Sequence, residues 1–215
     1  MHLWAIVFFY VSNFTINNKI WMERQDRMRR LILVTSPPAC GKTFISKEIS
    51  KALKPIVYLD KDTLIGLSNQ VFKVAGEENN RSSDFFEEHI RNTEYEVVID
   101  LALESLDYCD TVLINAPFTR EIRDLEYMDK FRKKLLDKDC QLVLIWVETD
   151  KEVCHQRMVE RNSERDTWKL ENWDEYISGC NFEQPKGIPE LRVFKNSSME
   201  EFNESMAELV KYFKN

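Results

Sequence analysis

The segment Leu31–Thr43 places the tightest constraint on the fold of this chain. Its sequence is LILVTSPPACGKT, in which a short apolar run gives way to small residues and ends at Gly41-Lys42-Thr43. Residues 31–34 predict a buried strand, and the apolar residues at positions 45, 49, 52 and 53 predict one face of a helix. A strand, a tight loop and a helix therefore follow one another without a break.

A loop of this kind is suited to binding the terminal phosphates of a nucleotide. Backbone N–H groups at the start of a helix point at an anion, and the helix dipole adds positive potential there. Lys42 is then expected to reach the β- and γ-phosphates, and the Thr43 hydroxyl to hold magnesium. The alternative is a chance Gly-Lys-Thr at the start of a helix. The predicted nucleotide-binding residues of this segment are Ser36, Pro37, Pro38, Ala39, Cys40, Gly41, Lys42, Thr43 and Phe44.

One position of the loop departs from the usual pattern, because Ser36 stands where that pattern begins with glycine. The two prolines that follow stiffen the loop without forbidding it. We therefore expect Ser36 to adopt the backbone angles that the loop requires.

The composition limits the kind of protein that this chain forms. Its 215 residues are 43% hydrophobic, which is enough for one domain with its own core. The 30 Lys and Arg residues against 37 Asp and Glu give a net charge of −7, which disfavours broad attraction to nucleic acid or anionic membranes. Five cysteines without a C-x-x-C pair or metal-ligand spacing indicate reduced thiols and a cytoplasmic protein.

Residues 1–29 form an apolar leader that differs from the rest of the chain. The stretch Leu3–Val11 is strongly apolar but shorter than the roughly 20 residues of a membrane-spanning helix, so we expect no stable membrane insertion. It also lacks the basic region and the cleavage site of a secretory signal. We expect either a natural extension outside the fold or a start codon assigned too early, with Met22 or Met28 as the alternative start. A weak membrane contact is a further alternative.

Four more apolar runs predict the remaining strands, at residues 56–59, 111–114, 141–147 and 191–194. Each is short and rich in β-branched or aromatic residues, and helical sequence separates it from the next. This alternation predicts an α/β fold of three layers, with a parallel sheet between two layers of helices. The domain is expected over residues 30–215, with a helical insertion at 62–110 that forms the wall of the substrate site.

The residues that close the strands are candidates for the site, because open parallel sheets bind ligands at the carboxyl ends of their strands. Asp60 closes the second strand and is expected to accept the proton of an attacking hydroxyl and to lie near the metal. Asp62 is assigned to capping the next helix. Asn115 closes the third strand, so the second anchor of the metal is either Asp60 or the carbonyl oxygen of Asn115.

Three arginines at intervals of four residues follow the fourth strand, at Arg157, Arg161 and Arg165. On a helix they lie along one side, and two of them could then face the transferred phosphoryl group. The alternative is a solvated helix on which they pair with neighbouring carboxylates. We expect Arg157 and Arg161 to act on the phosphates from a lid region at residues 155–180.

Four further polar side chains have two equal interpretations. Either they contact the substrate or they are ordinary charges and polar groups on a helix surface. These residues are Arg81, Arg91 and Tyr95 of the insertion and Arg120 after the third strand.

Several motifs together resemble those of the AAA-type P-loop ATPases of the small kinase group. The motifs are TSPPACGKT, YLDKD, VLINAPF, the stretch from Arg157 through RNSERDTWKL, and VFKNSS. The group includes polynucleotide 5′-hydroxyl kinases, zeta toxins, chloramphenicol phosphotransferase and the nucleoside-monophosphate kinases. The resemblance implies a P-loop NTPase sandwich with a five-stranded sheet in the order 2-3-1-4-5. It also implies Asp60 as the base, lid arginines, and the turn at Asn196 and Ser197 beside the adenine.

The sequence therefore predicts an ATP- and Mg²⁺-dependent phosphotransferase that moves the γ-phosphoryl group to a hydroxyl of a small molecule or nucleotide. An ATP-hydrolysing switch that responds to a protein partner is one alternative. A nucleic-acid 5′-end kinase is another, and the acidic composition disfavours it. The predicted catalytic residues are Lys42, Asp60, Arg157 and Arg161, the metal ligands are Thr43 and Asp60, and Asn196 contacts the nucleotide.

Overall fold

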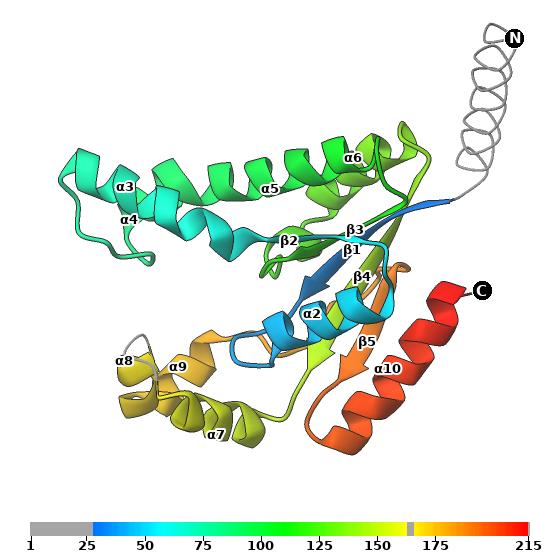
Figure 1. The fold of residues 1–215 in the computed structure, drawn as a ribbon. Coiled ribbons are helices and arrows are strands. Elements are labelled where there is room, and N and C mark those ends of the chain that lie inside the picture. The colour runs from blue at the N-terminus through cyan, green and yellow to red at the C-terminus, as the bar shows by residue number, and fades with distance from the viewer. Residues whose placement is uncertain (1–27, 163–165, 215) are drawn as a thin grey trace, which may run out of the picture.

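The chain forms one five-stranded sheet that lies between helices (Figure 1). The computed structural model describes residues 28–162 and 166–214, so residues 1–27 of the predicted leader and Arg165 lie outside the described residues. All strand pairs are parallel and the strand order is β2-β3-β1-β4-β5, which confirms the predicted fold. The strands are β1 (Arg29–Thr35), β2 (Val57–Asp60), β3 (Thr111–Asn115), β4 (Cys140–Glu148) and β5 (Leu191–Lys195).

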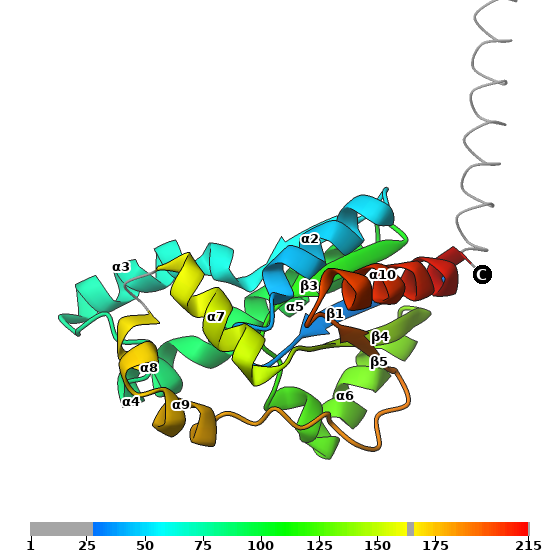
Figure 2. The same cartoon turned by 90° about the horizontal axis from the view of Figure 1, so that it is seen from below.

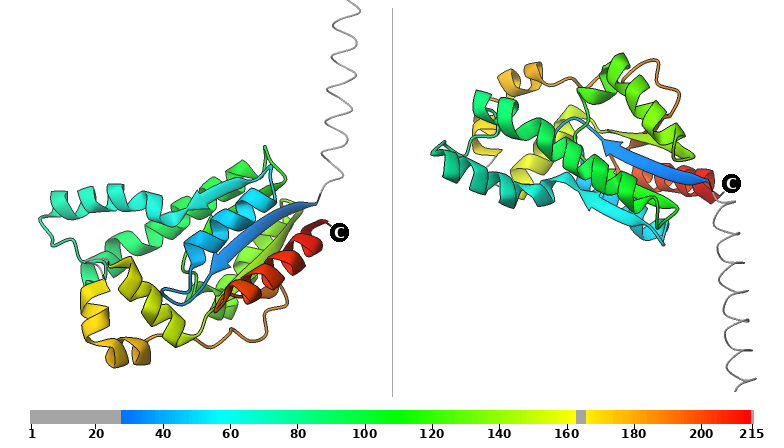
Figure 3. Two further views of the ribbon diagram at one scale, coloured as in Figure 1. Left: turned by 60° about the horizontal axis from the view of Figure 1, so that its bottom comes forward. Right: turned by 90° about the horizontal axis from the view of Figure 1, so that it is seen from above.

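Helices cover both faces of the sheet, as Figures 1 and 3 show. On one face lie α2 (Lys42–Ala52) and α10 (Met199–Lys214), and on the other α5 (Asn92–Ser105) and α6 (Leu125–Leu136). The alternation of side chains along β1 explains this arrangement, because Leu31 and Leu33 pack into one core while Ile32 and Val34 pack into the other. The sequence of a strand that is buried on both faces is a continuous run of apolar residues.

The predicted insertion is helical, and residues 84–105 form one continuous helix with a π-helical turn within it. It contains the 3₁₀ turn η1 (Lys61–Leu64), α3 (Ile65–Ala75), α4 (Asp84–Phe86), the π-helical turn η2 (Glu87–Arg91) and then α5. Phe72, Phe86 and Ile90 form a small core of their own, separate from the two cores of the sheet. The segment that begins at η1 and ends with η2 is called the wall below.

The wall and the predicted lid region lie beyond the carboxyl ends of the strands (Figures 1 and 2). The lid helices are α7 (Lys151–Arg161), α8 (Thr167–Glu171) and α9 (Trp173–Gly179), and the short turn η3 (Glu121–Arg123) precedes α6. Within the described parts of the chain, no helix is both long and apolar enough to cross a membrane. The ends of β1, β2 and β3 lie between the wall and the lid helices.

Candidate functional site

The loop between β1 and α2 turns sharply at Ala39 and Gly41. Both have positive φ, 62° at Ala39 and 85° at Gly41, in the left-handed region that disfavours side chains. A Cβ atom on Gly41 would lie 2.7 Å from Asn196 Nδ2, which is closer than side-chain atoms approach. Only glycine therefore fits at this position, and its backbone leads directly into the first turn of α2.

Residues from three later segments support the loop from behind. The carbonyl oxygen of Cys40 accepts hydrogen bonds from Asn196 Nδ2 at 2.8 Å and from Thr149 Oγ1 at 3.1 Å. Arg157 Nη2 in turn donates to the Asn196 carbonyl at 2.7 Å. Asn196 is buried, so the structure assigns it to supporting the loop, and its predicted contact with the nucleotide stays a prediction.

The thiol of Cys40 faces the protein interior. Its Sγ atom lies 3.7 Å from Cys154 Sγ on α7, and both residues are buried. The hydrogen bond with Cys154 and burial together raise the pKa of Cys40. The loop is thereby packed against the helix that carries the two lid arginines.

Lys42 and Thr43 at the start of α2 meet the end of β3 at Asn115. Lys42 Nζ donates to Asn115 Oδ1 at 2.9 Å, and Asn115 Nδ2 donates to Thr43 Oγ1 at 3.2 Å. Burial lowers the pKa of Lys42, and the carboxylates of Asp62 and Asp60 partly oppose that shift. Both side chains also line the cavity described below.

Asp60, and not Asp62, caps the 3₁₀ turn that follows β2. Asp60 Oδ1 accepts a hydrogen bond from the Asp62 backbone N–H at 3.0 Å, so Asp60 caps the 3₁₀ turn and the prediction that Asp62 caps it is wrong. The other Asp60 oxygen accepts from Tyr58 OH at 2.7 Å and from Asn115 Nδ2 at 2.8 Å. The Asp62 side chain is exposed, and its Oδ1 atom lies 3.6 Å from Lys61 Nζ. It lines the cavity described below.

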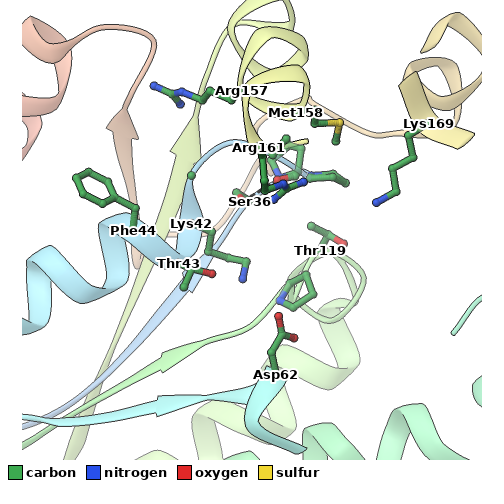
Figure 4. Close-up of a pocket in the computed structure, with 15 residues that line it drawn as sticks. Ser36, Lys42, Thr43, Phe44, Asp62, Thr119, Arg157, Met158, Arg161 and Lys169 are labelled. Carbon is green, nitrogen blue, oxygen red and sulfur yellow. Dashed lines mark hydrogen bonds between the residues drawn. The ribbon is translucent and has the colours of Figure 1, made fainter. Parts of the chain in front are cut away.

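A cavity of about 600 Å³ joins the phosphate loop to the wall and the lid (Figure 4). A cavity of this volume is typical of sites for small ligands. The predicted residues Cys40, Asp60 and Asn196 are not among its lining. The lining comprises Ser36, Pro37, Pro38, Ala39, Gly41, Lys42, Thr43, Phe44, Asp62, Pro117, Thr119, Arg157, Met158, Arg161 and Lys169.

The two lid arginines point to different parts of the site. Arg157 extends toward the side of Phe44 in Figure 4, consistent with its bond to Asn196. Arg161 donates to Asp166 Oδ2 from Nε at 2.8 Å, and Lys169 donates to Asp166 Oδ1 at 3.2 Å. Burial on its own would raise the pKa of Asp166, but the hydrogen bonds from Arg161 and Lys169 outweigh it, so the pKa is lowered.

Asp166 pairs with Arg161, as the alternative interpretation of the arginines expected of a neighbouring carboxylate. That interpretation missed the burial of Asp166, because it placed the pairs on a solvated helix, whereas the side chain is fully buried. A buried carboxylate needs charged or hydrogen-bonding partners, and here the partners are the two cations at the rim of the cavity. Asp166 therefore holds both cations in place.

The predicted polar residues of the insertion all have partners within the protein, and so does Arg120. Arg91 pairs with Glu121 at 2.7 Å and Arg120 with Glu87 at 2.6 Å. Tyr95 OH donates to the Pro117 carbonyl at 2.9 Å. These contacts favour the structural interpretation of these side chains over direct contact with the substrate.

Arg81 belongs to a buried cluster around Glu94. Glu94 accepts from Arg81 Nη2 at 2.6 Å and from Lys61 Nζ at 2.8 Å, and Ser68 Oγ donates to its second oxygen. Burial would raise the pKa of Glu94, but these hydrogen bonds outweigh it and lower the pKa to about 2. The cluster joins η1, α3 and the 81–83 turn to α5, and so fixes the wall to the sheet.

The depressed pKa of Glu94 predicts a loss of stability in acid. Its stabilisation, roughly 3 kcal/mol, is complete above the ordinary pKa of 4.5 and is lost as the pH falls toward 2. Urea unfolding at a series of pH values is expected to show this loss in the wild type and a smaller one in Glu94→Gln. Glu104→Gln, an exposed change on the same helix, is the control and should keep the wild-type profile. Equal acid sensitivity in all three proteins would contradict the prediction.

The donor groups near Thr43 fit a magnesium ion that binds together with a nucleotide. Mg²⁺ prefers oxygen ligands, keeps several waters and takes few protein ligands beside substrate phosphates. Oxygens of Thr43 and Asp60 contact the same Asn115 amide nitrogen, at 3.2 and 2.8 Å. In residues 28–162 and 166–214, no group of three or more His, Cys, Asp or Glu side chains could hold a metal alone. A phosphate-bound ion therefore suits the site better than a metal held by protein groups only.

Two of the solved structures that share this fold are small kinases. A gluconokinase from Sinorhizobium meliloti 1021 matches with a TM-score of 0.51 at 17% identity, over 88% of this chain and 99% of that chain. The APS kinase of Mycobacterium tuberculosis, solved in complex with AMPPNP and APS, matches with a TM-score of 0.53 at 16% identity, over 88% and 99%. At these identities the likeness shows the fold alone.

The comparisons by sequence give the family. No curated protein matches the chain. The model of an AAA domain family matches residues 31–182, which include β1 to β4, the phosphate loop, the wall and the lid helices. The chain therefore belongs to this AAA domain family, and its fold is that of the small P-loop kinases.

Proposed function

We propose that the protein is an ATP- and Mg²⁺-dependent phosphotransferase that acts on a hydroxyl of a small molecule or nucleotide. The observation that supports this most is the single cavity that contains the phosphate loop, Asp62 of the wall and Arg161 of the lid. A nucleotide on the loop and an acceptor against the wall would share this space. The presence of a gluconokinase and an APS kinase among structures of this fold agrees with the proposal.

The phosphate side of the site uses four groups of this chain. Lys42 contributes a charge at the β- and γ-phosphates, and Arg161 approaches the same phosphates from the lid. The Thr43 hydroxyl and the Asp60 carboxylate would hold the metal, directly or through water. When bound, Mg²⁺ supplies positive charge that neutralises the phosphate oxygens.

On the acceptor side we assign the base to Asp62 rather than to Asp60. Asp60 is not among the residues that line the cavity, and its oxygens already accept hydrogen bonds from Asp62 N–H, Tyr58 OH and Asn115 Nδ2. The Asp62 carboxylate is exposed to the cavity and free to accept the acceptor's proton as its oxygen bonds to the γ-phosphorus. The bond between the γ-phosphorus and the bridging oxygen breaks, and ADP leaves.

The proposal is tested with ATP labelled on the γ-phosphate and a panel of hydroxyl compounds. The expected result is ADP release that rises with one class of compound, with the label recovered on that compound. Lys42→Ala protein, prepared in parallel, controls for contaminating kinases. ADP release that no compound alters, but that a protein partner stimulates, would overturn the proposal in favour of a nucleotide-dependent switch. Labelling of nucleic-acid ends alone would identify a 5′-end kinase.

A further inference from the structure

Asn115 occupies the point where three strands of the sheet end together. It is the last residue of β3, and its neighbours in register are Val34 on β1 and Asp60 on β2. Its side chain is buried, with 1% of the residue exposed. From this position the amide reaches both the start of α2 and the end of β2.

The two ends of the Asn115 amide face groups of opposite charge. Its oxygen accepts hydrogen bonds from Lys42 Nζ at 2.9 Å and from Ser46 Oγ at 3.3 Å. Its nitrogen lies 2.8 Å from Asp60 Oδ2, 3.2 Å from Thr43 Oγ1 and 3.4 Å from Tyr58 OH. The opposite orientation would place the amide oxygen against the Asp60 carboxylate, so the charges on either side determine the orientation.

A neutral amide suits the charges on either side of this position. An aspartate would place a second carboxylate beside Asp60, where like charges repel. An apolar side chain would leave Lys42 without its acceptor and Asp60 without one of its donors. Asparagine bridges the cation and the anion without adding a charge of its own.

We propose that Asn115 is a positioning residue that holds the Lys42 ammonium at the phosphate loop before a nucleotide binds. A lysine side chain loses much rotamer freedom when it is fixed, and Asn115 fixes it in advance. On binding, phosphate oxygens accept the remaining N–H groups of the ammonium, while Asn115 Oδ1 keeps the one that it already holds. The inference rests on the proposed function only in requiring that the loop binds a nucleotide, and it does not depend on phosphotransfer.

The test is calorimetric titration of the full chain with ATP and, separately, with AMP, in EDTA so that no metal contributes. Asn115→Ala is expected to weaken ATP binding by about tenfold, the cost of ordering one long side chain. AMP lacks the β- and γ-phosphates that Lys42 reaches, so its affinity should not change. Ser46→Ala removes the other donor to the same amide oxygen, keeps Lys42 in place and should bind ATP like the wild type.

A double-mutant cycle separates positioning from a structural role. If Asn115 acts through Lys42, adding Asn115→Ala to Lys42→Ala should cause no further loss of ATP affinity. Additive losses, or an equal loss for AMP, would overturn the inference. If Asn115→Ala does not fold, Asn115→Ser, whose hydroxyl is too short to reach Lys42 Nζ, replaces it with the same expectations. Failure to find an acceptor would overturn the proposed function and leave these binding results unaffected.

Discussion

Lys42→Ala is expected to lower kcat by at least about 10²-fold and to reduce turnover below detection with slow acceptors. Lys42 is the cation at the start of α2, and it lies inside the cavity that the phosphates would fill. Its hydrogen bond goes to Asn115 and its side chain belongs to neither core of the sheet. The loss should therefore appear in catalysis, with little change in the melting temperature.

The measurement is steady-state phosphotransfer combined with thermal unfolding of the same preparation. Lys47→Ala is the matched control, because Lys47 is an exposed lysine on the same helix and does not line the cavity. Its rate should equal that of the wild type. Phosphotransfer at the wild-type rate in Lys42→Ala would show that the phosphates do not bind at this loop.

Asp62→Asn is expected to lower kcat by about 10²- to 10⁴-fold, the usual contribution of a general base, and to leave the affinity for ATP nearly unchanged. The amide keeps the size of the side chain but cannot take a proton from the acceptor. Asp62 has an exposed side chain and belongs to no core, so the fold should not suffer. The split between kcat and affinity, measured by rates and by calorimetry, is the informative result.

Asp60→Asn provides the comparison for this prediction. Asp60 caps η1 and accepts hydrogen bonds from both Tyr58 and Asn115. Asp60→Asn should therefore lower the free energy of unfolding and reduce the stimulation of phosphotransfer by magnesium. Its kcat at saturating magnesium should fall less than that of Asp62→Asn. A collapse of kcat in Asp60→Asn together with an unchanged kcat in Asp62→Asn would assign the base to Asp60, as the sequence had suggested.

Much of the fold could be predicted from the sequence because its signals are local. Each strand is a short apolar run, and the predicted run 141–147 lies within the observed β4, Cys140–Glu148. Arg157 and Arg161 lie on one helix, α7, as their spacing predicted. Buried parallel strands and amphipathic helices have different periods, so a few neighbouring residues distinguish them. The strand order came from the family resemblance and is confirmed.

The site was harder to predict for two reasons. Some of its contacts join residues that are far apart in the sequence, and some of its roles fall to one of two similar residues that lie close together in the sequence. The bond between Asn196 and the Cys40 carbonyl spans 156 positions, and no local pattern indicates it. Asp60 and Asp62 are only two residues apart, and which of them caps depends on where the 3₁₀ turn begins. The burial of Asp166 depends on how α7 and α8 pack together. Residue types and their positions therefore predicted which residues are candidates for the site. The role of each candidate depends on tertiary contacts that the sequence does not reveal.

The separate core of Phe72, Phe86 and Ile90 means that the wall can diverge in sequence independently of the sheet. A substitution among these three residues would change the packing inside the wall, while the two sheet cores keep theirs. In the proposed enzyme, the acceptor side could then acquire a new specificity without repacking the strands that position the phosphate loop.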